Sequence, residues 1–175
     1  QVEKYLDEKV LGLFRKGRTA ELQGYGIGAL AYYRRVVVSV TEKLLDDLRQ
    51  VLVTDENDVD VKRLDQILKE HREEERLEHA AGLLPPRMRP GNANPCSLLF
   101  RGISVGMKTM GEKEALERAQ EMAESLTSVI RMLAQTDEAR RYEEAIKKLG
   151  EIRKDDSTSS EDEQKNADEG EPTED

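Results

Sequence analysis

Two adjacent arginines, Arg34 and Arg35, lie inside an otherwise apolar helical run and are well suited to binding an anion. Arg34 follows Leu30 by four residues and precedes Val37 by three, so a helix places it on their face. Two neighbouring guanidinium groups can hold a phosphate through paired N–H donors. The alternative, which we favour for a charge on an apolar stripe, is a salt bridge to a neighbouring helix.

A second candidate pair consists of Arg72 and His79, whose six-residue separation matches a spacing used by helical ribonucleases. Three glutamates follow Arg72 directly, and their charges oppose the approach of a phosphodiester. We therefore favour a solvated charged stretch over residues 71–79, which we expect to extend into water. The stretch also lacks the cysteines and carboxylate geometry of a zinc site, so the sequence predicts no metal and no cofactor.

Glycines at alternate positions, Gly24, Gly26 and Gly28, precede the paired arginines. A glycine-rich turn at a helix start can cradle a phosphate with backbone N–H groups. The nucleotide-binding versions need a preceding strand or a Gly-Lys-Ser/Thr ending, and this sequence has neither. We therefore interpret the glycines as sites of close helix packing.

Length and composition favour one helix-rich domain, because the chain has 175 residues, 37% of them charged, and no Trp. The net charge of −9 lies in residues 155–175, which contain ten acidic residues and one lysine. Residues 1–154 are neutral, and so lack the general attraction of a basic surface for nucleic acid. The sequence predicts a helical domain over residues 1–154 and a disordered, solubilising acidic tail over residues 155–175.

The single cysteine, Cys96, excludes an internal disulfide and favours a reducing compartment. Because Leu98 and Leu99 follow it and no histidine is nearby, we interpret it as a small buried thiol. The longest uncharged apolar run, residues 27–33, is far shorter than the roughly 20 residues of a membrane span. These features predict a cytoplasmic protein with no membrane partner. The chain begins with Gln1, which leaves room for an upstream domain.

Apolar residues recur at spacings of three and four, and the sequence contains no strand pattern, so we expect an all-α fold. Gly17 is the expected end of the first helix, and Asp58 and Thr136 are expected N-caps. Leu98, Leu99 and Met107 are expected to enter the core. The predicted helices cover residues 2–16, 24–53, 58–84, 97–107, 112–135 and 136–154.

Three motifs carry a family resemblance. The first is the run Gly24-Tyr-Gly-Ile-Gly-Ala-Leu-Ala-Tyr-Tyr-Arg-Arg-Val-Val, and the second is Asn94-Pro95-x-Ser97-Leu98-Leu99 followed by Gly102-x-Ser104-x-Gly106. The third is Glu112-Lys-Glu114-Ala-Leu116. Together they resemble a bacterial group within the HEPN-like superfamily (higher eukaryote and prokaryote nucleotide-binding), over about residues 20–135. The resemblance implies an up-and-down helical bundle that often dimerises.

The resemblance also bears on catalysis, because active HEPN ribonucleases place an arginine and a histidine around the turn before the last core helix. Arg101 matches the arginine, and Lys108 stands where the histidine is expected. Lysine, with an ordinary pKa near 10.4, is a poor general base at neutral pH. The departure argues against nuclease activity at this turn.

Three functions are consistent with these features. The favoured one is a non-catalytic helical interaction module that binds a second copy of itself or another protein. The alternative is a nucleotide- or RNA-binding domain whose anion site gathers Arg34, Arg35, Arg101 and Lys108. RNA cleavage by Arg72 and His79 is the least favoured.

Overall fold

The computed structural model describes residues 5–84, 86–89, 91 and 93–167, with side chains up to residue 148 except 81 and 87. The described residues form helices and contain no strand, which confirms the all-α prediction. In chain order the elements are α2 (Glu8–Leu22), α3 (Gly26–Thr54), α4 (Asp58–Ile67), α5 (Glu73–Ala80), the 3₁₀ turns η1 (Ala81–Leu83) and η2 (Pro86–Met88), α6 (Pro95–Thr109) and α7 (Glu112–Ala167). None of the described helices is long and apolar enough to cross a membrane.

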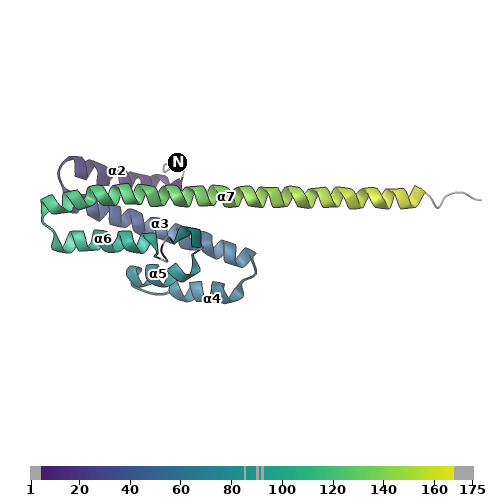
Figure 1. The fold of residues 1–175 in the computed structure, drawn as a ribbon, viewed down its shortest axis with the longest axis horizontal. Helices are drawn as coiled ribbons and strands as arrows, with labels where there is room; N and C mark the ends of the chain where they lie inside the picture. The colour runs from purple at the N-terminus through teal and green to yellow at the C-terminus, as the bar shows by residue number, and fades with distance from the viewer. Residues whose placement is uncertain (1–4, 85, 90, 92, 168–175) are drawn as a thin grey trace, which may run out of the picture. The chain divides into compact units, whose positions relative to one another are not determined.

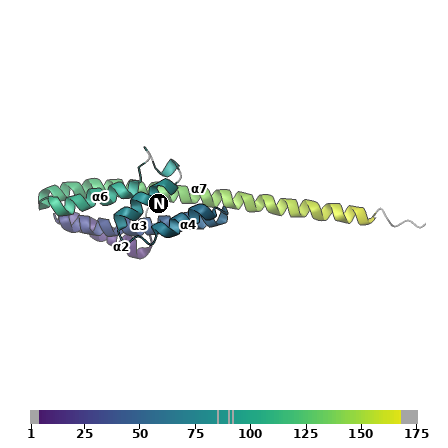
Figure 2. The same ribbon diagram turned by 90° about the horizontal axis from the view of Figure 1, so that it is seen from below.

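The chain divides into two units, Gln1–Ala134 and Gln135–Asp175, and α7 contributes residues to both. In the first unit α2, α3, α6 and the start of α7 lie side by side and run in alternating directions (Figures 1 and 2). The pair α4 and α5 is inserted between α3 and α6 and lies along the second half of α3 (Figure 1). The first unit is therefore a helical bundle with a small helical insertion.

Helix α3 is the centre of this bundle, and the sequence predicted its extent closely. Its apolar stripe is long enough to contact α2 and α6 as well as the insertion. Three residues of the stripe, Ile27, Arg34 and Val51, remain partly or largely accessible. Its large buried side chains are Leu30, Tyr33, Val36, Val37, Val40, Leu44, Leu45 and Leu48.

The predicted end of the first helix at Gly17 is wrong, because α2 continues to Leu22. Its N-cap is Asp7, whose Oδ1 accepts a hydrogen bond from the Val10 backbone N–H at 2.7 Å. Gly17 lies inside the helix, where a Cβ would overlap the ring of Tyr33. The glycine therefore serves close packing of α2 on α3 and not helix termination.

The prediction of a single helix over residues 58–84 is also wrong, because α4 ends at Ile67 and a separate helix, α5, begins at Glu73. Asn57, and not Asp58, caps α4 by accepting a hydrogen bond from the Asp60 N–H at 3.2 Å. The break reorients the chain so that Leu77 of α5 becomes buried. Residues 71–79 thus do not simply extend into water, since α5 packs on α3 and α6.

Helix α6 starts two residues earlier than predicted, and its start is fixed by Asn94. The Asn94 side chain accepts a hydrogen bond from the Cys96 N–H at 3.0 Å and donates one to the Leu77 carbonyl at 2.6 Å. One buried amide therefore caps α6 and ties it to α5. Leu99 enters the core and Met107 packs against it, whereas Leu98 is 57% exposed, contrary to its predicted place in the core.

The helix break predicted at Thr136 is wrong as well, because α7 is continuous through that residue. Thr136 is a poorer helix former than its neighbours, but no glycine or proline stands nearby to end the helix. The disordered tail predicted from residue 155 is not confirmed, since α7 continues to Ala167 and residues 168–175 lie outside the described residues. The boundary predicted at residue 154 stays a prediction.

Candidate functional site

Arg34 lies between α3 and the insertion, where its Nη2 donates to Glu73 Oε2 of α5 at 3.2 Å. Its guanidinium carbon also lies 4.8 Å from the ring centre of Phe100 on α6, a cation–π distance. The arginine on the apolar stripe thus joins three helices. This is the ion pair with a neighbouring helix that the sequence favoured over a free anion site.

Arg101 of α6 also faces carboxylates of α5. Its Nη2 donates to Glu78 Oε1 at 2.5 Å, and its Nε lies 3.5 Å from Glu74 Oε1. All three side chains are about half exposed, so each pair contributes at most about 1 kcal/mol to the free energy of unfolding. The local consequence is electrostatic, because two carboxylates beside Arg101 oppose an approaching phosphate.

The other two members of the predicted anion site, Arg35 on α3 and Lys108 on α6, are exposed. Neither forms an ion pair or side-chain hydrogen bond with a described residue. The structure therefore pairs two of the four cations with carboxylates of α5 and leaves two facing solvent. A shared anion site made of all four stays a prediction.

Arg72 and His79 each contact a different glutamate. Arg72 Nη1 donates to Glu75 Oε1 at 3.2 Å, and its side chain is 80% exposed. His79 Nδ1 lies 2.7 Å from Glu70 Oε1. Arg72 thus pairs with a residue three positions along the chain, whereas His79 pairs with Glu70 in the segment between α4 and α5.

The close-packing interpretation holds for Gly26 but is wrong for Gly24, which has a φ of 82° and open space beside it, and for Gly28, whose added Cβ would make only ordinary contacts. The interpretation of Cys96 as a buried thiol is confirmed. A Cβ at Gly26 would overlap the backbone of Leu116, so the glycine permits α3 and α7 to approach closely. Cys96 is buried, and that burial raises the pKa of its thiol to about 11, while a contact with Thr41 acts weakly in the opposite direction. A thiol held in its protonated form is a poor nucleophile.

A buried polar cluster between α2 and α3 did not follow from the sequence. The Tyr33 hydroxyl donates to Glu21 Oε2 at 2.6 Å, and Arg18 Nη1 donates to both Glu21 oxygens at 2.8 and 3.0 Å. Burial, and secondarily the Glu21 carboxylate, raises the pKa of Tyr33. The only sequence signal is the Arg18–Glu21 spacing of three, which is common on exposed helices.

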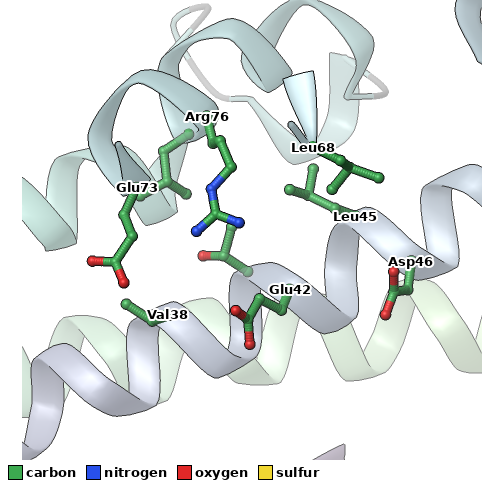
Figure 3. A pocket seen from close by; sticks show the side chains of 9 residues that line it. Val38, Glu42, Leu45, Asp46, Leu68, Glu73 and Arg76 are labelled. Carbon is green, nitrogen blue, oxygen red and sulfur yellow. The ribbon is translucent and has the colours of Figure 1, made fainter. Parts of the chain in front are cut away.

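A pocket of about 240 Å³ between α3 and α5 was also missed by sequence reasoning (Figure 3). Leu45, Leu68 and Leu77 line its apolar part. The charged side chains around it come from α3 and α5, with Glu42 and Arg76 among them. No local pattern predicts it, because it depends on the break between α4 and α5.

No cluster of histidine, cysteine or acidic side chains suited to a metal ion occurs in the part of the chain that the structure describes. Comparisons with protein-family models, with curated proteins and with solved structures found no match.

Proposed function

We propose that this chain is a non-catalytic helical interaction module that pairs with a second copy of itself through residues 135–148 of α7. The observation that carries the proposal is the exposure of two large apolar side chains in the second unit. Tyr142 is 68% exposed and Ile146 is 50% exposed, and every residue from 141 to 148 is accessible to solvent. A second helix laid along them would remove this apolar surface from water.

The spacing of the exposed residues supports a helical partner. Ala139, Tyr142 and Ile146 are separated by three and four residues, so they share one face of α7. This is the a/d spacing of helices that pair side by side. A second copy supplies the same stripe and gives a self-complementary two-fold contact.

Charged side chains occupy the other faces of this segment and pair within the helix. Asp137 contacts Arg140 at 3.0 Å and Arg141 at 2.9 Å, and Arg140 Nε lies 3.7 Å from Glu144. By helix geometry Asp137 lies nearly opposite Tyr142. The charges therefore support the helix without covering its apolar stripe.

Two further observations support a non-catalytic role. The arginine that resembles a nuclease residue, Arg101, is held by Glu74 and Glu78. Lys108 offers an ammonium where a histidine would serve as the base. The resemblance to HEPN-like bundles, which often dimerise, agrees with self-association.

Size-exclusion chromatography with light scattering, over about 1–100 µM protein, tests the proposal. We expect a dimer for the full chain and a shift to monomer for the double variant Tyr142→Ser/Ile146→Ser. The matched control is Val59→Ser, which removes an apolar side chain that is 78% exposed in the first unit and should leave the dimer intact. A chain that stays monomeric at 100 µM, or a dimer that the double variant leaves intact, contradicts the proposal.

A further inference from the structure

The pocket between α3 and α5 has an apolar wall and a charged rim of both signs (Figure 3). Leu45 and Leu77 are buried in the core, and Val38 and Leu68 complete the apolar wall. The volume of the pocket is about 240 Å³. The apolar wall is therefore suited to a small ligand with an aliphatic portion.

The rim carries three carboxylates and one guanidinium. Some of these groups already interact with other side chains of the protein, and some do not. Glu73 is paired with Arg34, and Asp46 interacts electrostatically with Arg49. Glu42 and Arg76 form no ion pair or side-chain hydrogen bond with any described residue. Glu42 is exposed and Arg76 is half-buried, so one anion and one cation on the rim are accessible to a ligand.

The two unpaired groups come from different helices and face the same space. Figure 3 shows the Arg76 side chain reaching from α5 toward α3, with its guanidinium between Glu73 and Glu42. Arg76 is half-buried, so its charge is screened less than that of a fully exposed arginine. A guanidinium binds a carboxylate through two parallel N–H donors, and a carboxylate accepts hydrogen bonds from an ammonium group.

We propose that this pocket binds a small zwitterion, namely a free α-amino acid with an aliphatic side chain. The carboxylate of the ligand pairs with Arg76, and its ammonium group pairs with Glu42, with Asp46 nearby on the same helix. The aliphatic side chain contacts the leucines of the wall. A ligand of this kind contacts the cation and the anion of the rim as well as the apolar wall. A ligand with a single charge pairs with only one of the two rim groups.

A titration of the ¹⁵N-labelled full chain with L-leucine, followed by amide chemical shifts, tests the proposal. We expect saturable shifts at residues of α3 and α5 around the pocket, with a dissociation constant on the order of 1 mM for so small a ligand. Two analogues each lack one charge: 4-methylpentanoate has no ammonium and 3-methylbutylamine has no carboxylate. Each should bind about tenfold more weakly, because each leaves one rim group unpaired.

Two variants assign the roles of the rim residues. Arg76→Gln and Glu42→Gln should each weaken leucine binding about tenfold, the first without affecting 3-methylbutylamine and the second without affecting 4-methylpentanoate. The matched controls are Arg131→Gln and Glu124→Gln, which change exposed residues of α7 and should leave binding unchanged. Circular dichroism of every variant verifies that the helices are intact.

Three results would overturn the proposal: no saturable shifts with leucine, binding of 3-methylbutylamine as tight as that of leucine, or unchanged leucine binding in a folded Arg76→Gln variant. The second result would identify a site for cationic side chains instead. The test is independent of self-association, because the residues of the stripe on α7 take no part in it.

Discussion

Helix α7 contains two regions with the same local pattern and opposite surroundings. In the first unit most of its apolar residues are buried, with Leu126 and Ile130 fully inaccessible. In the second unit Tyr142 and Ile146 recur at similar spacings and remain exposed. A three-and-four spacing thus identifies which residues share a face, but it does not say whether anything covers that face.

The largest expected effect separates two isoleucines of this one helix. Ile130→Ala should lower the free energy of unfolding by about 2–5 kcal/mol, because it leaves a cavity in a closely packed core. Ile146→Ala should change the stability of the first unit by less than about 0.5 kcal/mol, because its side chain is half exposed. Urea unfolding of both variants, followed by circular dichroism, checks the difference. Equal losses of unfolding free energy would mean that Ile130 and Ile146 are buried to the same extent, contrary to this comparison.

A second prediction concerns the contact that covers the start of α7. Gly26→Ala places a methyl group against the Leu116 backbone and should cost about 1–3 kcal/mol, because neither helix can yield locally. Gly28→Ala is the matched control, since its nearest neighbour would be an ordinary 3.6 Å away. Alanine there should stabilise the helix by about 0.5–1 kcal/mol. Thermal unfolding curves of the two variants should therefore shift in opposite directions.

A third prediction compares two tyrosines in these contrasting surroundings. Tyr33→Phe removes the hydroxyl that donates to the buried Glu21 and should cost about 1–2 kcal/mol, since Arg18 remains as a partner. Tyr142→Phe removes a solvated hydroxyl and should leave the stability unchanged. Denaturant midpoints of both variants, measured under the same conditions, check this difference. An unchanged midpoint for Tyr33→Phe would mean that the Tyr33 hydroxyl contributes nothing to stability.

The smallest effect concerns Cys96, whose thiol is buried in the first unit. Burial raises its pKa to about 11 from an ordinary value of 9.0, so the folded state favours the protonated thiol. The contribution of this group to stability is therefore complete below pH 9 and is lost as the pH rises toward 11. We expect a thiol reagent to react slowly with the native chain at pH 8 and quickly after unfolding in urea. A fast native reaction would contradict the burial of this thiol.

Several features of the fold could be predicted from the sequence because they depend on neighbours along one helix. The extent of α3 followed from its apolar stripe and from the polar residues after Val53. The predicted start of a helix at residue 112 is the observed start of α7. The close packing at Gly26 and the burial of Cys96 were also predicted, whereas Gly24 and Gly28 make no such close approach.

Other boundaries could not be predicted because long-range packing outweighs local signals. Gly17 is a common helix-ending residue, yet the Tyr33 ring occupies the space beside it and the helix continues. The break after Ile67 carries no glycine or proline. It permits Leu77 to reach the core and brings the glutamates of α5 to Arg34 and Arg101.

The sequence by itself determined the class of the fold, the faces of its helices and the positions of its cationic side chains. Only the tertiary structure decided which of those residues were already paired, because the partners of Arg34 and Arg101 lie on α5, far along the chain. It also decided that Glu42 and Arg76 meet at one pocket. Charge pairing between helices depends on distances in space, and helical periodicity specifies only directions around one axis.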